Sequence, residues 1–402
     1  MSQSIHLGIS TCPNDTFLFH GLLTGRVDTR GLDFQIELCD VEELNRRLLG
    51  GEFDVAKASF HAALAATAEL GVLPTGAAIG FGNGPLLLAA RAGAVPGPDA
   101  RVLCPGAHTT ASLLYRLFHP RSKAAEQVVF SAIVPALERG EADFGVVIHE
   151  GRFTYAEHGL HLVEDLGTSW ERETGAPLPL GGILARRSLG QPTLCKVQAV
   201  LRASLSHALS HREETLPTMR RYAQELSDEV LLAHVDLYVN RWTADLGATG
   251  RAALDALARC AADLGPAGGA SDRRPLQVIG TERLFHLVPE VDWRAHCAAI
   301  DAGSPASWKP GSLASQGFVH LSFAEQIAGT LAAHLAGAGS VCLLEVDAGR
   351  AGDALVLESA REGVLFPHLQ RALEPADLLH CWTLREGPDG WQVPDLDHPP
   401  TD

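Results

Sequence analysis

Short apolar runs alternate with amphipathic stretches through the first half of the chain. The runs at 5–10, 34–39 and 55–59 have the length and the flanking turn residues of buried strands. Strands that alternate with helices form sheets rich in parallel pairs, so this pattern predicts an α/β fold. The intervening stretches, which have the apolar spacing of helices, are 14–23, 41–49 and 60–70.

The pattern changes further along the chain. An apolar segment at 77–90 is split by Gly82-Asn-Gly84-Pro85, a glycine-rich break that suits a chain crossing between two lobes. After Arg186, residues 193–262 have a mainly helical pattern with breaks near Pro217 and Gly247. We expect this helical part to return the chain to the first lobe.

A linker separates this region from the rest of the chain. Residues 264–275 are rich in glycine, proline and small residues, which favours a flexible connection. The segment that follows has its own strand-like runs, a helix and tryptophans. We therefore predict a first domain over 1–263 and a small α+β domain over 276–390.

The first candidate for chemistry is His149. It ends the apolar run Phe144–Ile148, which predicts a buried strand. Ligands of open α/β sheets collect at the carboxyl ends of strands, and an imidazole there can act as a base or an acid. A structural histidine is the alternative.

Two further places combine polar side chains with predicted element ends. Thr109 and Thr110 precede the helical stretch Ala111–Phe118, where a threonine either only caps the helix or also presents free N–H groups to an anion. Lys57 lies inside a strand-like run that ends at Ser59. A buried lysine needs a partner. Lys57 therefore either pairs with a substrate carboxylate or extends its ammonium group to solvent.

A polar turn and an arginine complete this set. Asn14, Asp15 and Thr16 follow a proline at a strand-to-helix turn, where they either cap the helix or line a cleft. Arg152 can hold an anion with two hydrogen bonds, or pair with Glu150 or Glu157 instead.

Charge and cysteine usage exclude several classes of protein. Acidic residues outnumber basic ones by 48 to 32, a net charge of −16, which argues against nucleic acid and anionic membrane surfaces as partners. We find no signal peptide and no apolar stretch long enough to span a membrane. The eight scattered cysteines indicate reduced thiols rather than a disulfide frame or a metal site, so we expect a cytoplasmic protein.

Several blocks together resemble one family. The chain resembles the 1,4-dihydroxy-6-naphthoate synthases of the futalosine route to menaquinone over about its first 265 residues. The blocks, in order, are Ser10-Thr-Cys-Pro-Asn-Asp-Thr-Phe17, Asp54-Val-Ala-Lys-Ala-Ser59, Gly106-Ala-His-Thr-Thr-Ala111, His149-Glu-Gly-Arg-Phe-Thr-Tyr155, Leu166-Gly-Thr-Ser-Trp-Glu-Arg-Glu-Thr-Gly-Ala-Pro-Leu-Pro-Leu-Gly-Gly182 and Tyr238-Val-Asn-Arg-Trp-Thr-Ala-Asp-Leu-Gly247.

The resemblance implies a two-lobed fold of the periplasmic-binding-protein type, with one lobe at about 1–88 and 186–263 and the other at about 89–185. It implies a lyase that converts cyclic dehypoxanthinyl futalosine, a small anionic carboxylate, into the naphthoate without a cofactor or a metal. His149 is then the base, and Lys57, Ala58, Ser59, Thr109 and Thr110 bind the substrate. The alternatives are a small-molecule binding protein and the sister chorismate dehydratase of the same pathway.

The C-terminal segment resembles a small uncharacterised bacterial family over most of 280–375. That resemblance suggests a fold like that of the ADP-ribosyltransferases. Candidate residues for a second site are His286, His320, Ser322, Glu358 and His368. The alternative is that the domain only stabilises the protein or recruits a partner.

Overall fold

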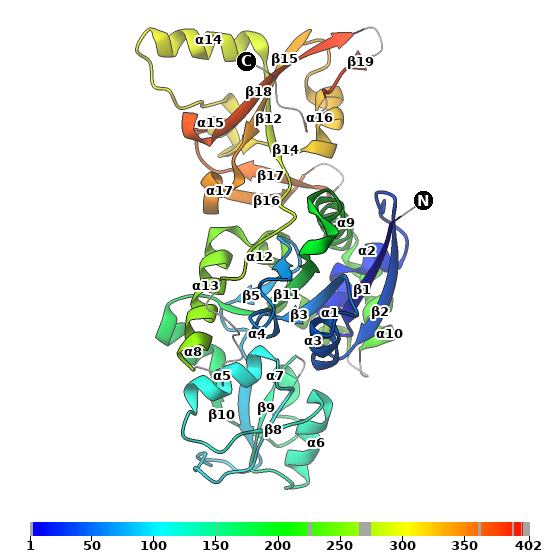
Figure 1. Cartoon of the computed structure of the whole chain (residues 1–402), viewed down its shortest axis with the longest axis vertical. Coiled ribbons are helices and arrows are strands. Elements are labelled where there is room, and N and C mark those ends of the chain that lie inside the picture. Colours follow the sequence, from blue (N-terminus) through cyan, green and yellow to red (C-terminus); the bar gives the residue numbers. More distant parts are fainter. Residues whose placement is uncertain are drawn as a thin grey trace. The chain divides into compact units, whose positions relative to one another are not determined.

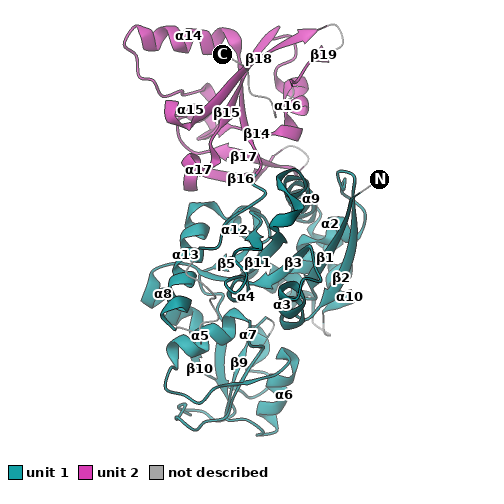
Figure 2. Ribbon diagram, in the orientation of Figure 1, with its two compact units in different colours: residues 1–281 teal, residues 282–402 magenta. Residues whose placement is uncertain are grey.

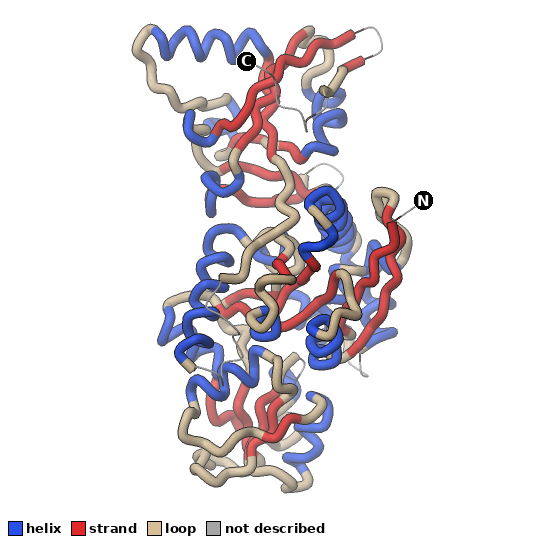
Figure 3. Tube along the Cα trace, viewed as in Figure 1, coloured by secondary structure: helices blue, strands red, loops and turns tan. Residues whose placement is uncertain are grey.

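The computed structural model describes residues 3–149, 151–223, 227–264, 275–360, 363–387, 390–394 and 396. The chain divides into two compact units, residues 1–281 and 282–402, which are coloured separately in Figure 2. Each unit is described by itself below. Figure 3 shows that both units mix helices with strands.

The first sheet of unit 1 is built mainly from the beginning of the chain. Strand β1 pairs in parallel with β2 and β3, as the alternating pattern predicted. Strand β11 pairs antiparallel with β3, β4 and β5. The strands are β1 (Gln3–Ser10), β2 (Leu32–Cys39), β3 (Val55–Ser59), β4 (Leu70–Val72), β5 (Ala78–Gly80) and β11 (Leu178–Arg186), in the order β2-β1-β3-β11-β4 with β5 beside β11.

The second sheet of unit 1 has the order β10-β6-β9-β7-β8. Figure 1 labels its strands β8, β9 and β10. Strand β7 is parallel to β8 and β9, whereas β6 is antiparallel to β9 and β10. The predicted strand before His149 is β9. The strands are β6 (Leu86–Ala89), β7 (Val102–Cys104), β8 (Glu126–Gln127), β9 (Phe144–Val147) and β10 (His161–Asp165).

These sheets form two lobes, and the chain crosses between them earlier than we expected. Strand β6 already belongs to the second sheet, and all of β11 belongs to the first. The second lobe is therefore about 85–177 rather than 89–185. The chain enters the second lobe through β6 and returns to the first through β11. Both strands run antiparallel to their neighbours, so each sheet contains parallel and antiparallel pairs. The α/β prediction is confirmed.

Helices cover both sheets. Asp40, Thr109 and Asp165 accept backbone N–H bonds at the starts of α3, α5 and α8. The helices of unit 1 are α1 (Pro13–Leu18), α2 (His20–Leu23), α3 (Val41–Leu49), α4 (Phe60–Ala63), α5 (Thr110–Phe118), α6 (Ile133–Glu138), α7 (Gly151–Thr154), α8 (Leu166–Thr174), α9 (Gln191–Ser210), α10 (Leu216–Tyr222), α11 (Asp228–Tyr238), α12 (Arg241–Ala244) and α13 (Gly247–Asp263), with 3-10 turns η1 (Phe130–Ala132), η2 (Arg187–Leu189) and η3 (Arg212–Thr215).

Two helix predictions can be compared with these bounds. The helix expected over 60–70 ends at Ala63, because Leu70 already pairs with β11 in the sheet. The predicted breaks near Pro217 and Gly247 are confirmed, since these residues lie at the starts of α10 and α13.

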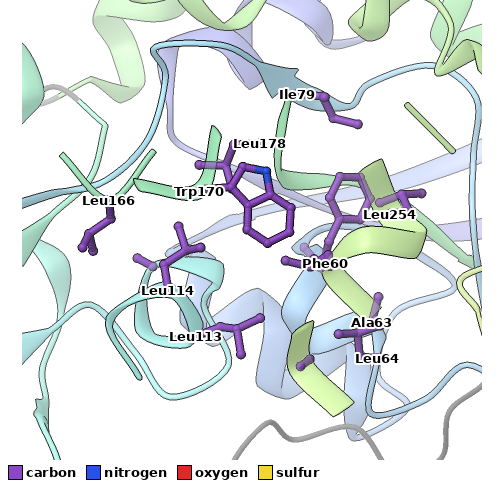
Figure 4. Packing of buried hydrophobic residues seen from close by; sticks show 14 of the residues in the cluster. Phe60, Ala63, Leu64, Ile79, Leu113, Leu114, Leu166, Trp170, Leu178 and Leu254 are labelled. Carbon is purple, nitrogen blue, oxygen red and sulfur yellow. The ribbon is translucent and has the colours of Figure 1, made fainter. Parts of the chain in front are cut away.

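The largest core of unit 1 joins side chains from both lobes. Trp170 and Phe60 are fully buried, and Figure 4 shows their rings among leucines of several elements. Trp170 comes from the second lobe and Phe60 from the first. Their shared core fixes the two walls of the site described below relative to one another.

Unit 1 also includes a segment beyond its last helix. Val72 donates its N–H to Gln277 O at 2.9 Å, and Ile279 N–H returns a bond to Val72 O at 2.9 Å. Leu276 is buried in the main core. Unit 2 consequently begins at residue 282, six residues after the expected start at 276. Residues 265–274 of the expected linker at 264–275 lie outside the described residues.

Unit 2 is α+β, as predicted. Its first sheet is antiparallel, in the order β14-β12-β15-β18-β19, and its second, also antiparallel, has the order β13-β17-β16. The likeness to ADP-ribosyltransferases stays a prediction. The elements are β12 (Leu284–Pro289), α14 (Glu290–Asp301), α15 (Gly311–Gln316), β13 (Val319–His320), β14 (Ser322–Phe323), η5 (Ala324–Gln326), α16 (Ile327–His334), β15 (Ser340–Val346), α17 (Ala348–Ala351), η6 (Gly352–Ala354), β16 (Leu355–Ser359), β17 (Leu365–Leu369), η8 (Pro375–Asp377), β18 (Leu378–Gly387) and β19 (Gly390–Trp391).

Two properties concern the whole described chain. Among the described helices, none combines the length and the apolar character needed to cross a membrane. All eight cysteines fall within the described residues, and none of them is in a disulfide.

Candidate active site

A pocket of about 650 Å³, partly open to solvent, lies between the two lobes of unit 1. Its walls come from the β1–α1 turn, the end of β3, the start of α5, the end of β9, strand β11 and helix α11. The candidate residues that line it are His149, Lys57, Ala58, Ser59, Thr109, Thr110, Asn14 and Asp15. Thr16 and Arg152 do not line it.

His149 stands just past the end of β9 in a left-handed backbone conformation, with φ 54°. Few side chains adopt this conformation, although histidine and asparagine are among those that tolerate it. The turn directs the imidazole to the pocket, where Cys12 Sγ lies 3.3 Å from Nε2 and 3.4 Å from Nδ1. The ring of Phe130 contacts it edge-on at 5.0 Å between centroids. A half-buried imidazole held in this way can exchange a proton with a ligand.

Lys57 has a protein partner in the pocket. Its Nζ donates to Asp15 Oδ1 at 2.7 Å, and both side chains are buried. A second, longer bond joins Nζ to Gly76 O at 3.4 Å. An ammonium group has three donors, so the pair leaves Lys57 able to bind a ligand as well.

Side chains between β1 and the first turn of α1 hold the Asp15 carboxylate in place, and they do not cap α1. Ser10 Oγ donates to Asp15 Oδ2 at 2.5 Å, and Asn14 Nδ2 donates to Oδ1 at 2.9 Å. Thr16 Oγ1 bonds the carbonyl of Cys12 at 3.1 Å. The capping alternative is wrong for these residues, because they lie inside the helix that begins at Pro13.

The start of α5 confirms the predicted threonine cap. Thr109 Oγ1 accepts from Ser112 N and donates to Gly106 O at 2.8 Å. Thr110 Oγ1 donates to Leu180 O at 2.6 Å, which ties the second lobe to β11 of the first. Thr109, Thr110 and Ala111 at this helix start line the pocket, where a helix N-terminus favours an anion.

Close backbone contacts form the floor of the pocket beside Ala58. Gly181 pairs with Ser59 in the sheet, and a Cβ at Gly181 would lie 2.6 Å from Ala58 O. Asn45 fixes Ser59 by accepting its N–H at 2.8 Å and donating to its Oγ at 3.2 Å. The site therefore needs the small residues found here.

Arg152 has a structural partner that the sequence did not indicate. It donates to Asp165 Oδ2 and to Gly84 O, each at 2.7 Å. Asp165 also caps α8 through Gly167 N and Thr168 N. Arg152 thus joins the segment before β6 to the segment before α8. Glu157 is not its partner among the described residues, and Glu150 lies outside them.

His234 is a pocket residue that sequence reasoning missed. It lies on α11, it is fully buried, and neither ring nitrogen has a hydrogen-bond partner within the described structure. Burial, with His149 and Lys57 nearby, lowers the pKa of His234 well below its ordinary value, so the ring is neutral. In sequence it stands between apolar residues at helical spacing, which is the pattern of an ordinary core histidine.

The second-site candidates of unit 2 do not all come together. Both ring nitrogens of His286 have hydrogen-bond partners: Nδ1 lies 2.8 Å from His320 O, and Nε2 accepts from Trp308 Nε1 at 2.9 Å. Ser322 bonds Thr330. His320 and His368 face each other across β13 and β17 with ring centroids 5.2 Å apart, and His368 Nδ1 lies 2.7 Å from Glu358 Oε2.

The fold and the pocket together define a class. Two α/β lobes joined by crossing strands, with a polar pocket between them, are the arrangement of the periplasmic-binding-protein type. Solved structures agree: the alkanesulfonate-binding protein of Xanthomonas axonopodis pv. citri, bound to MOPS, matches 68% of this chain and 96% of its own with a TM-score of 0.51 and 16% identity. A protein of Archaeoglobus fulgidus matches 65% of this chain and 98% of its own with a TM-score of 0.63 and 30% identity.

Within this class, a family model described as menaquinone biosynthesis matches residues 5–263. The chain belongs to this family. Two relatives named 1,4-dihydroxy-6-naphthoate synthase are similar to it: one from Thermus thermophilus, 43% identical, covers 63% of the chain and 92% of its own length, and one from Streptomyces coelicolor, 41% identical, covers 64% and 92%. A second family, described only as a protein of unknown function, matches residues 287–380. The resemblances seen in the sequence are confirmed.

Proposed function

We propose that unit 1 converts cyclic dehypoxanthinyl futalosine into 1,4-dihydroxy-6-naphthoate, as a carbon–carbon lyase of the futalosine route acting in the cytoplasm. The names of the relatives support the product, and family membership supports the pathway. The observation that carries the proposal is the placement of His149, whose imidazole stands on a constrained turn, in the wall of the pocket.

In this mechanism a ring nitrogen of His149 takes a proton from a carbon of the bound substrate. The electron pair released from that C–H bond forms a new double bond as a bond of the sugar-derived ring breaks. The carbon–carbon bond to the sugar remnant then breaks, and the carbon that keeps its electron pair takes the proton that His149 holds. Loss of the remnant lets the remaining ring system become aromatic, so no net oxidant is required. One positioned base of this kind contributes about 10²–10⁴-fold to the rate.

The substrate carboxylate is bound on the opposite side of the pocket. The first-turn N–H groups of α5, next to Thr109 and Thr110, provide donors and a favourable helix dipole. Lys57 adds a cation whose charge is balanced by Asp15 before the substrate arrives. Balancing that charge lowers the cost of keeping a lysine buried in the empty pocket.

The direct test is turnover by the purified full chain. We expect the naphthoate and the sugar remnant to appear in equal amounts from the cyclic futalosine derivative. Release of water from chorismate would instead support the dehydratase. Saturable binding of the futalosine derivative with no product would support a binding protein.

A further inference from the structure

A second cluster of ligand-type side chains lies in unit 1, outside the pocket. His20 on α2, His207 near the end of α9 and Glu214 in η3 each have a ligand atom within 4.8 Å of the others. None of the three lines the pocket. His20 is far in the sequence from His207 and Glu214, so spacing alone does not reveal the cluster.

We propose that His20, His207 and Glu214 form a binding site for a divalent transition metal of the zinc class. Two imidazoles, one carboxylate and an open fourth position are a ligand set that zinc uses in proteins. Atoms bound to one tetrahedral zinc at about 2.1 Å lie about 3.4 Å apart, whereas these ligand atoms lie within 4.8 Å of one another, so each pair needs to close by about 1.4 Å or less.

One ligand atom of the cluster is buried without a hydrogen-bond partner among the described residues. His207 Nε2 is inaccessible to solvent and has no hydrogen bond to any described residue. A buried ring nitrogen left in this state is costly, and a metal ion in the cluster would satisfy it. The His207 ring stacks on that of His20, with centroids 5.7 Å apart, so both rings border the same space.

His20 is oriented as metal-bound histidines usually are. Its Nδ1 lies 2.8 Å from Thr218 Oγ1, and this bond leaves the Nε2 lone pair for a metal. Outer partners of this kind fix the tautomer of a ligating histidine.

The bound metal would brace the first lobe. It would join α2, the end of α9 and η3, and so add to the hydrogen bond from Leu22 N to Ser204 Oγ that already links α2 to α9. A ligand bound only by the folded state raises its stability, so zinc at about 100 times its dissociation constant should raise the Tm by about 5 °C.

The test is zinc titration of the full chain, free of any histidine tag and of metal, with calorimetry to count the sites. We expect one strong site in the wild type and a dissociation constant raised at least about 10-fold in Glu214→Gln, His207→Gln and Thr218→Val. His158→Gln, which alters a surface histidine–glutamate pair with Glu138, is the matched control and should bind as the wild type does. Glu214 is exposed, so its variant is expected to fold.

Cobalt provides an independent readout, because thiolate ligands give a near-ultraviolet charge-transfer band and imidazole and carboxylate ligands do not. A visible spectrum of tetrahedral cobalt without that band supports the site. Failure of the wild type to bind, equal binding by Glu214→Gln and His207→Gln, or a thiolate band that points to the cysteines would each overturn it. Turnover of the futalosine derivative is measured separately and is expected to be the same for Glu214→Gln.

Discussion

At the scale of single residues, the site depends on two histidines in opposite situations. His149 is half-buried, and Cys12 Sγ lies beside its ring nitrogens. His234 is fully buried, and both of its ring nitrogens lack partners among the described residues. A neutral imidazole offers one donor and one acceptor, so His234 is suited to bind substrate atoms while His149 moves the proton.

Replacing His234 by phenylalanine tests this role. The substitution removes two buried polar atoms whose desolvation is uncompensated, at about 1–3 kcal/mol each, so the Tm should not fall. Loss of hydrogen bonds to the substrate should lower kcat/KM by about 10- to 100-fold. A lower Tm together with unchanged kcat/KM would instead make His234 a core residue.

His286 in unit 2 predicts a pH dependence of stability. Burial lowers its pKa from 6.5 to about 4. Below about pH 6.5 the His286 imidazole binds a proton in the unfolded chain but stays neutral in the folded chain. The free energy of unfolding therefore decreases as the pH falls from 6.5 to 4. The loss approaches about 3 kcal/mol. Urea unfolding between pH 7 and 4 should show this trend, and His286→Gln should flatten it; an equal trend in the variant would count against the assignment.

Single residues also show how far sequence reasoning reaches. The position of His149 and the Thr109 cap follow from local patterns, a strand end and a helix start. The partner of Arg152 and the place of His234 in the pocket wall do not, because both depend on which segments tertiary packing brings together. Local rules describe a residue's neighbours in sequence, and these contacts are long-range.

At the scale of elements, the two segments that connect the lobes, before β6 and at the start of α8, contact each other closely. Gly84 precedes β6, and Gly167 lies in the first turn of α8. A Cβ on Gly84 would lie 2.3 Å from Gly167 Cα and 2.4 Å from its N, both backbone atoms that cannot rotate away. The close approach explains the glycine in the break that the sequence analysis identified.

Gly84→Ala should therefore be strongly destabilising, by about 3 kcal/mol, since overpacking against backbone leaves little room to relax. The midpoint of urea unfolding measures the change. Gly97→Ala is the matched control, because a Cβ there meets nothing within 4 Å. Equal midpoints for the two variants would mean that the backbone at Gly84 and Gly167 can shift to accommodate a methyl group.

The α/β alternation could be predicted from the sequence, but the direction of the crossing strands could not. Apolar periodicity gives the burial of β6 and β11, and it carries no information on which neighbour each strand meets. The neighbours of these strands depend on long-range packing, of which the core shared by Trp170 and Phe60 is a part.

At the scale of the molecule, the end of unit 1 lies beyond the family match at 263. Residues 276–279 add backbone bonds to Val72 and bury Leu276. A chain of residues 1–281 should have a higher Tm than one of residues 1–263, by the equivalent of about 3 kcal/mol from one buried leucine and two hydrogen bonds. Equal melting temperatures would show that this segment contributes nothing.

The central claim is that His149 is the base of a naphthoate-forming lyase. Single-turnover conversion of cyclic dehypoxanthinyl futalosine by the wild type and by His149→Asn tests it most directly, because asparagine also tolerates the left-handed turn. We predict that the wild type forms the naphthoate and that the variant binds substrate equally well but reacts about 10²–10⁴-fold more slowly. A variant as fast as the wild type, or a wild type that binds without forming product, would contradict the account.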